Sequence, residues 1–376
     1  MNLPSRTVHV ATICFVRGAG FVRGVSAMND VLPEYRALEA RIRAALRADL
    51  DEAEFGALAL EAHAFQKRWN PPYAKFCATR PEAAHWREIP AVPQSAFKSA
   101  RLAVAPPELV TRTFRTSGTT GETRGEHHFL DTQLYDAAIL AGWDALVGRK
   151  AGAAILLTPV DTDAPHSSLS HMLRVLARER TSGPVFPVVD ARGKLEPERF
   201  RAAMAACFSM KHPVALFGTA LAFLHLGEQF SDGCFDRRRG TFALETGGYK
   251  GSGREVPKAE LYGRIGAMFT LQPEDIINEY GMTELSSQFY TRGLGQPHEG
   301  PPWLRAVVID PETGGEAAVG ETGVLRIFDL ANLGSVLAVE TQDLAVRREC
   351  GFELLGRDPA ALPRGCSRAA DERMRA

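Results

Sequence analysis

Residues 113–125 read TFRTSGTTGETRG, and this stretch of hydroxyl side chains and glycines decides how the chain is interpreted. It contains almost no apolar residue beyond Phe114, so it cannot contribute to a core. Glycines let the backbone approach a ligand closely, and successive amides in such a loop form a concavity that binds anions. The hydroxyls add hydrogen-bond donors, and Arg124 adds a permanent positive charge. We therefore predict an anion-binding loop, with a solvated turn as the alternative.

The overall composition is that of a globular protein with a sizeable core, since 45% of its 376 residues are hydrophobic. A formal net charge of −1 offers no general attraction to nucleic acid or anionic lipid, so neither is expected as a partner. No apolar run approaches the ~18 residues of a membrane span. The six cysteines are scattered without a CxxC pair, which favours reduced thiols in a cytoplasmic protein.

The first 27 residues lack both a clean signal-peptide pattern and amphipathic helical order. Arg17 and Arg23 interrupt their longest apolar run. We predict that residues 1–27 form a disordered extension, with Met28 as a candidate for the true start. Targeting to an organelle by an arginine-rich leader is the alternative.

Buried-strand runs alternate with helical stretches downstream of the loop. The runs AAILLTP (153–159), VALFG (214–218) and TFALET (241–246) are separated by segments long enough for helices. Such alternation predicts right-handed βαβ units and a mostly parallel sheet, whose ligands bind beyond the carboxyl ends of the strands.

The pattern changes from Leu304, where short β runs and hairpin-like turns predict a small β-rich C-terminal subdomain. The last residues are rich in Arg, Pro and Ala and show little periodicity. We therefore expect an α/β domain over residues 28–303, a β-rich subdomain of the same unit over residues 304–355, and a flexible tail over residues 356–376.

The loop does not match two common nucleotide-binding motifs. A Walker-type loop would require a second glycine five residues after Gly118, where Thr123 stands. The dinucleotide fingerprint GxGxxG is also absent from the sequence. A P-loop NTPase and a dinucleotide-binding fold are therefore not supported by motif.

Five motifs in order resemble those of the adenylate-forming enzyme superfamily. TSGTTGETRG (116–125) resembles its phosphate loop, and EYGMTE (279–284) resembles the motif whose Glu helps to hold Mg²⁺. TGGYKG (246–251) stands where the family has its adenine-binding segment, and TQDL (341–344) resembles its ribose-binding motif. GFELLGRDP (351–359) resembles the hinge before the family's mobile C-terminal domain.

The more specific resemblance is to the acyl-protein synthetase branch, the fatty-acid-activating component of the bacterial luciferase reductase complex. The segments VPQSAFKS (92–99), ALFGTA (215–220) and ELLGRDPAALPRGCS (353–367) resemble that branch. The resemblance implies the family's N-terminal-type fold with mostly parallel sheets and a truncated C-terminal lid. It also implies ATP and Mg²⁺ as cofactors, a fatty acid as substrate, and an acyl-reductase protein as partner. The chain departs from the family in having Thr123-Arg124 where Pro-Lys is common.

The resemblance also implies roles for individual residues. Glu284 is expected to hold Mg²⁺, Arg124 to bind phosphates and Asp343 to bind the ribose hydroxyls, while Tyr280 or Tyr249 stacks on adenine. The residues expected to contact ATP are Thr116, Ser117, Gly118, Thr119, Thr120, Gly121, Gly247, Gly248, Tyr249, Tyr280, Gly281, Thr283, Asp343 and Arg357.

Cys366 is the expected acyl acceptor, because it stands where the family has its acyl-accepting cysteine. Arg364 and Arg368 flank it and favour the reactive thiolate. The predicted activity is ATP-dependent activation of a carboxylic acid, followed by acyl transfer to Cys366 and then to a reductase. Two alternatives remain open: an acyl- or aryl-CoA ligase, and a nucleotide-binding scaffold without turnover.

Overall fold

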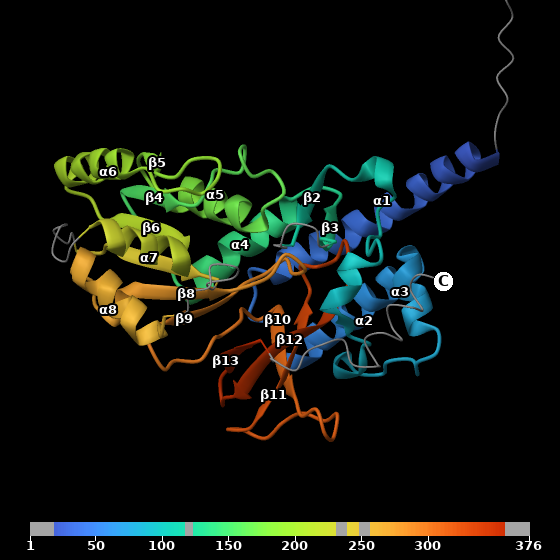
Figure 1. Ribbon diagram of the computed structural model, residues 1–376. Coiled ribbons are helices and arrows are strands. Elements are labelled where there is room, and N and C mark those ends of the chain that lie inside the picture. Colours follow the sequence, from blue (N-terminus) through green and yellow to red (C-terminus); the bar gives the residue numbers. More distant parts are fainter. Residues whose placement is uncertain (1–18, 117–122, 231–238, 248–255, 358–376) are drawn as a thin grey trace, which may run out of the picture.

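The computed structural model describes residues 19–116, 123–230, 239–247 and 256–357, and only the helical backbone of residues 19–30. Two sheets and a hairpin organise these residues (Figure 1). No helix in the described part of the chain is long and apolar enough to cross a bilayer.

The larger sheet is mostly parallel, as the sequence predicts. Its strand order is β5-β4-β6-β7-β8-β9, and only β9 runs antiparallel to its neighbour. The strands are β4 (Ala153–Leu157), β5 (Val185–Pro187), β6 (Val214–Thr219), β7 (Phe242–Thr246), β8 (Ile276–Tyr280) and β9 (Phe289–Arg292).

Helices cover both faces of this sheet, because alternate residues of its strands point into two separate cores. Ile155 of β4 packs in one core, while Leu156 packs in the other. The first core is completed by α6 (Pro197–Met210), α7 (Ala220–Gln229) and α8 (Lys258–Phe269). The second is completed by α4 (Gln133–Leu146) and α5 (Ser168–Arg180).

The second sheet has the strand order β1-β12-β11-β10, with β13 paired to β12. Its bounds are β1 (Val92–Pro93), β10 (Leu304–Ile309), β11 (Thr322–Asp329), β12 (Ala338–Arg347) and β13 (Phe352–Arg357). The predicted change to β structure after Leu304 is therefore confirmed. The expected hinge segment forms β13 as far as Arg357, and the rest of it lies outside the described residues.

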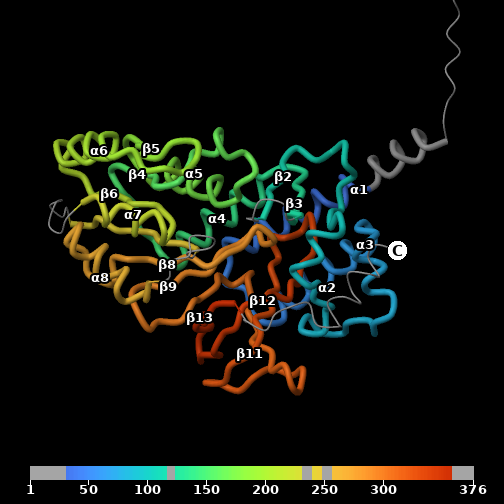
Figure 2. The backbone as a smooth tube through the Cα atoms, in the orientation of Figure 1, coloured from blue at the N-terminus to red at the C-terminus, as the bar shows by residue number. Residues whose placement is uncertain are grey.

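The N-terminal helices pack on this second sheet. They are α1 (Ala19–Ala45), α2 (Glu52–Trp69) and α3 (Pro71–Cys77). Their apolar faces share one core with the C-terminal strands, and the ring of Trp86 meets that of Phe328 at a centroid distance of 4.9 Å. Figure 2 shows the blue N-terminal and the orange-to-red C-terminal segments side by side.

The β-rich subdomain predicted for residues 304–355 shares its sheet and core with other parts of the chain, since β1 pairs in parallel with β12 and residues from Val31 onward fill the same core. Helix α1 begins at Ala19, inside the extension predicted for residues 1–27, and residues 1–18 lie outside the described residues. Sequence periodicity does not report such long-range pairing.

A short hairpin packs against the larger sheet, since its Phe114 and Phe129 belong to one of the cores of that sheet. Strand β2 (Arg112–Arg115) pairs antiparallel with β3 (Glu126–Phe129), so the predicted anion loop connects two hydrogen-bonded strands. Its base is closed twice, because the Thr116 amide donates to the Gly125 carbonyl and the Gly125 amide donates to Thr116 Oγ1, both at 2.9 Å.

Candidate active site

The sites predicted from the TQDL and EYGMTE motifs meet where the two sheets adjoin. The Tyr280 hydroxyl, at the end of β8, donates to Asp343 Oδ2 in β12 at 2.8 Å. Arg357 of β13 lies opposite, with its Nε 3.8 Å from Asp343 Oδ1. Three residues that were predicted from separate motifs therefore lie together. One carboxylate oxygen of Asp343 accepts from Tyr280, and the other faces the guanidinium of Arg357.

The ring of Tyr280 is already well packed, with 8% of the residue exposed. It lies edge-on to Phe352 at a centroid distance of 5.5 Å, and burial raises the pKa of its hydroxyl well above the ordinary value. The hydroxyl therefore stays protonated and serves as the donor that orients Asp343. Stacking of Tyr280 on adenine remains a prediction.

The turn after β8 is tied to the hairpin by His127 of β3. His127 Nδ1 donates to the carbonyl oxygen of Thr283 at 2.7 Å, and Ser168 Oγ lies 3.3 Å from Thr283 Oγ1. Burial lowers the pKa of His127 to about 4, so the imidazole is neutral at physiological pH. This neutral donor, which sequence reasoning did not identify, fixes the predicted magnesium motif against the strand that leads out of the anion loop.

Glu284 is held by a buried polar network at the end of β11 and in the turn after it. Asn332 Nδ2 donates to the backbone carbonyl of Glu284 at 2.8 Å. The Ser286 amide and the Ser287 hydroxyl both donate to the Asp329 carboxylate at 2.8 Å. Burial raises the pKa of Asp329 to about 6, against the effect of these donors. The network fixes the backbone on both sides of Glu284 and so positions its side chain.

Glu284 suits the magnesium role, although it is a single carboxylate. No group of three His, Cys, Asp or Glu side chains that could hold a metal occurs within the described ranges. Mg²⁺ in nucleotide sites is typically bound by one or two carboxylates, with phosphate oxygens and water supplying the remaining ligands. One buried, well-fixed glutamate therefore fits an ion that arrives with a nucleotide; the ion would neutralise charge on the phosphates.

The remaining predicted site residues are only partly described. Thr116 forms the base of the anion loop, Arg124 is exposed beside it, and Gly247 follows β7 with a positive φ of 72°. Those outside the described residues are Ser117, Gly118, Thr119, Thr120, Gly121, Gly248, Tyr249 and Cys366.

Glu279, inside the predicted motif but not assigned a role, is a buried acid at the same edge. The Thr246 hydroxyl donates to one of its carboxylate oxygens, and a Cβ on Gly281 would lie 2.4 Å from the other. A side chain at position 281 would therefore require the Glu279 carboxylate to move. Burial raises the pKa of Glu279 to about 7.

Replacing Glu279 with Gln is expected to stabilise the unliganded protein at high pH. Because burial raises the pKa of Glu279 above its ordinary 4.5, stability falls as the pH rises from 4.5 through about 7. The free energy of unfolding of the variant should exceed that of the wild type by on the order of 2 kcal/mol at about pH 8, and the two should be equal near pH 4. Urea unfolding across pH measures this, with the exposed Glu312→Gln as control. A difference in the free energy of unfolding that is constant at all pH values would contradict a raised pKa for Glu279.

If Asp343 binds a ribose, as its motif predicts, Asp343→Asn should weaken nucleotide binding without loss of the fold. An asparagine oxygen still accepts from Tyr280, whereas the negative charge toward a ribose is lost. We expect KM for ATP to rise about tenfold, since hydrogen bonds to charged groups contribute ~1.5–3 kcal/mol. Steady-state kinetics measure the effect, with exposed Asp49→Asn as the matched control. An unchanged KM would remove Asp343 from the nucleotide site.

Comparison with known proteins places this geometry in context. No family model matches the chain. The sequence is 22% identical over 302 residues to a long-chain-fatty-acid–luciferin-component ligase of Aliivibrio fischeri. The aligned region spans 78% of this chain and 79% of the relative.

The fold is similar to that of 2-hydroxyisobutyryl-CoA ligase. Its open conformation in complex with 2-HIB-AMP and CoA matches with a TM-score of 0.62 at 15% identity, over 85% of this chain and 79% of the ligase. Its postadenylation state with 2-HIB-AMP matches with a TM-score of 0.60, over 83% and 69%. The resemblance indicated by the sequence motifs is confirmed, and the chain has the fold of the adenylate-forming ligases.

Proposed function

We propose that the chain uses ATP to activate a carboxylic acid and then transfers the acyl group to a protein thiol. The observation that supports this most directly is the hydrogen bond from Tyr280 to Asp343, which joins the predicted magnesium motif to the predicted ribose motif. The His127–Thr283 bond brings the strand after the anion loop to the same turn. One nucleotide could therefore contact all three motifs.

The first step needs positioned charges more than a general base. A carboxylate oxygen attacks the α-phosphorus, the bond to the bridging oxygen breaks, and pyrophosphate leaves with the electron pair. Negative charge accumulates on phosphate oxygens, so cations and fixed donors provide most of the stabilisation. Arg124 and the hydroxyls of the loop would serve the terminal phosphates, Glu284 would hold Mg²⁺, and Asp343 would hold the ribose.

The second step is transfer to sulfur. In this proposal the Cys366 thiolate attacks the acyl carbon, AMP leaves, and the acyl group is then passed to a partner reductase. The Aliivibrio fischeri relative, a long-chain-fatty-acid–luciferin-component ligase, supports a long-chain fatty acid as the substrate. The cysteines that the structure describes, Cys77, Cys207 and Cys350, are all free thiols, as a cytoplasmic setting would allow.

Product analysis tests the proposal. The full chain is incubated with ATP, Mg²⁺ and fatty acids of graded length, together with an aryl acid, and AMP and pyrophosphate are quantified. The proposal predicts equal amounts of the two, dependent on the acid, and a hydroxylamine-sensitive acyl group on the protein. Release of ADP and phosphate would contradict adenylation. Formation of a soluble thioester only when CoA is added would replace the protein thiol with CoA as the acceptor.

A further inference from the structure

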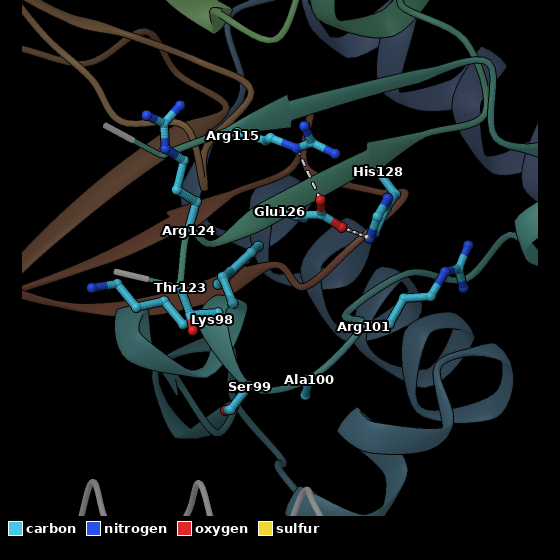
Figure 3. A pocket seen from close by; sticks show the side chains of 10 residues that line it. Lys98, Ser99, Ala100, Arg101, Arg115, Thr123, Arg124, Glu126 and His128 are labelled. Carbon is cyan, nitrogen blue, oxygen red and sulfur yellow. Dashed lines mark hydrogen bonds and ion pairs between the residues drawn. The ribbon is translucent and has the colours of Figure 1, made fainter. Parts of the chain in front are cut away.

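An open hollow of about 570 Å³ lies beside the hairpin, between its strands and the segment 97–101 (Figure 3). The hairpin contributes Arg115, Thr123, Arg124, Glu126 and His128 to its lining. The other wall is formed by Phe97, Lys98, Ser99, Ala100 and Arg101. Figure 3 shows Lys98 and Arg124 at one end of the hollow and Arg101 at the other.

The lining is strongly basic, and its one carboxylate is already engaged. Arg115 Nε donates to Glu126 Oε1 at 3.0 Å, and His128 Nε2 lies 3.6 Å from Glu126 Oε2. Neither Lys98 nor Arg124 forms an ion pair with another residue that the structure describes. Lys98 and Arg124 therefore place two positive charges at one end of the open hollow, while Glu126 neutralises the charge of Arg115. This arrangement attracts a multivalent anion.

Lys98 is attached firmly to the base of the anion loop. It is the last residue of the 3₁₀ helix η2 (Gln94–Lys98), and its neighbour Phe97 is buried against the loop stem. A Cβ on Gly125 would lie 3.2 Å from Phe97 Cβ and 3.4 Å from the Phe97 carbonyl carbon. Gly125 thus permits a close approach of η2 to the stem, and this approach sets the backbone position of Lys98 relative to Arg124.

We propose that Lys98 and Arg124 together bind the terminal phosphates of the nucleotide and retain the pyrophosphate when it leaves. This inference rests on the proposed adenylation and adds Lys98, from outside the loop, to its phosphate site. The loop itself has Thr123-Arg124 and no lysine. Lys98 supplies the compact ammonium charge, and Arg124 supplies a planar fork of donors that matches two phosphate oxygens. Both charges stabilise the electron pair that moves onto pyrophosphate as the bridging bond breaks.

Calorimetric titration of the full chain with magnesium pyrophosphate, without nucleotide or acid, tests the site. The proposal predicts saturable binding by the wild type that Lys98→Gln weakens by about ten- to hundredfold, as expected for loss of a charged hydrogen-bond donor. Lys98→Arg should restore most of the affinity. Lys75→Gln, at an exposed lysine of α3, is the matched control and should bind as the wild type does. Circular dichroism checks that each variant is folded.

The outcomes separate this inference from the proposed function. Equal pyrophosphate affinity of Lys98→Gln and the wild type would overturn the role of Lys98, and so would absence of binding by the wild type. If the wild type binds pyrophosphate through Lys98 yet no acid supports AMP formation, adenylation fails while the anion site stands. Affinity lost to the same degree in Lys75→Gln would mean that general surface charge, and no defined site, binds the anion, which also overturns the proposal.

Discussion

Replacing Glu284 with Gln is expected to lower the rate of acid-dependent pyrophosphate exchange by about a hundredfold, equivalent to ~2.7 kcal/mol of transition-state stabilisation. Glutamine has the same length, and Asn332 would still donate to the backbone carbonyl of this residue, so the turn is retained. What is lost is the negative charge that would hold Mg²⁺ against the phosphate oxygens.

The measurement is the initial exchange rate as a function of Mg²⁺ concentration. Raised Mg²⁺ should restore part of the activity of the variant, because weaker binding of the ion is the expected defect. Glu274→Gln, at an exposed residue of the same region, is the matched control and should behave as the wild type does. A variant with full activity at low Mg²⁺ would show that Glu284 does not hold the ion.

Cys366→Ser is expected to abolish covalent acylation of the protein and to leave pyrophosphate exchange intact. The two steps use different groups in our proposal, since adenylation needs the phosphate and ribose sites and transfer needs the thiolate. Cys366 lies outside the described residues, so this prediction rests on its sequence context between Arg364 and Arg368.

Radiolabelled acid followed by denaturing electrophoresis measures the bound acyl group, and hydroxylamine identifies a thioester. Cys350→Ser is the control, because Cys350 is an exposed free thiol elsewhere in the chain and should be dispensable. A hydroxylamine-sensitive acyl group that persists on the Cys366→Ser protein would assign the acceptor role to another residue. Loss of exchange in that variant would show that the two steps are not separable in this way.

The parallel sheet was predictable because its strands are short, continuous apolar runs that are buried on both faces. AAILL in β4 is the clearest case, with all five residues buried. Helix α8 was not predicted, although Leu261, Ile265 and Phe269 recur at the spacing of one buried helical face. That signal was available in the sequence and could have identified the helix.

The joining of the N-terminal helices to the C-terminal strands was not predictable from local pattern. Val92 pairs with Val339, almost 250 positions later in the chain. Gln66 of α2 reaches the same distant region, where its side chain donates to the carbonyl of Asn332 at 3.0 Å. Such contacts depend on tertiary packing, whereas periodicity reports only which face of an element is apolar.

The residues of the candidate site that stand in recognisable motifs could be named from the sequence, whereas the buried residues that support them could not. Asp343, Tyr280 and Arg357 could be named because each stands in a recognisable motif. His127 and Asp329 could not, since neither stands in a motif or at a spacing that predicts its contacts. Their roles come from burial beside a specific partner, which only the folded chain provides.

We propose that the loop stem, Glu284 and Asp343 form one site that adenylates a carboxylic acid. Exchange of labelled pyrophosphate into ATP by the wild-type chain tests it most directly, because exchange requires reversible adenylation and no acyl acceptor. We expect exchange that depends on both Mg²⁺ and an acid, with a clear preference among acids of graded length. ATP binding without exchange for any acid of the series, aryl acids included, would contradict it.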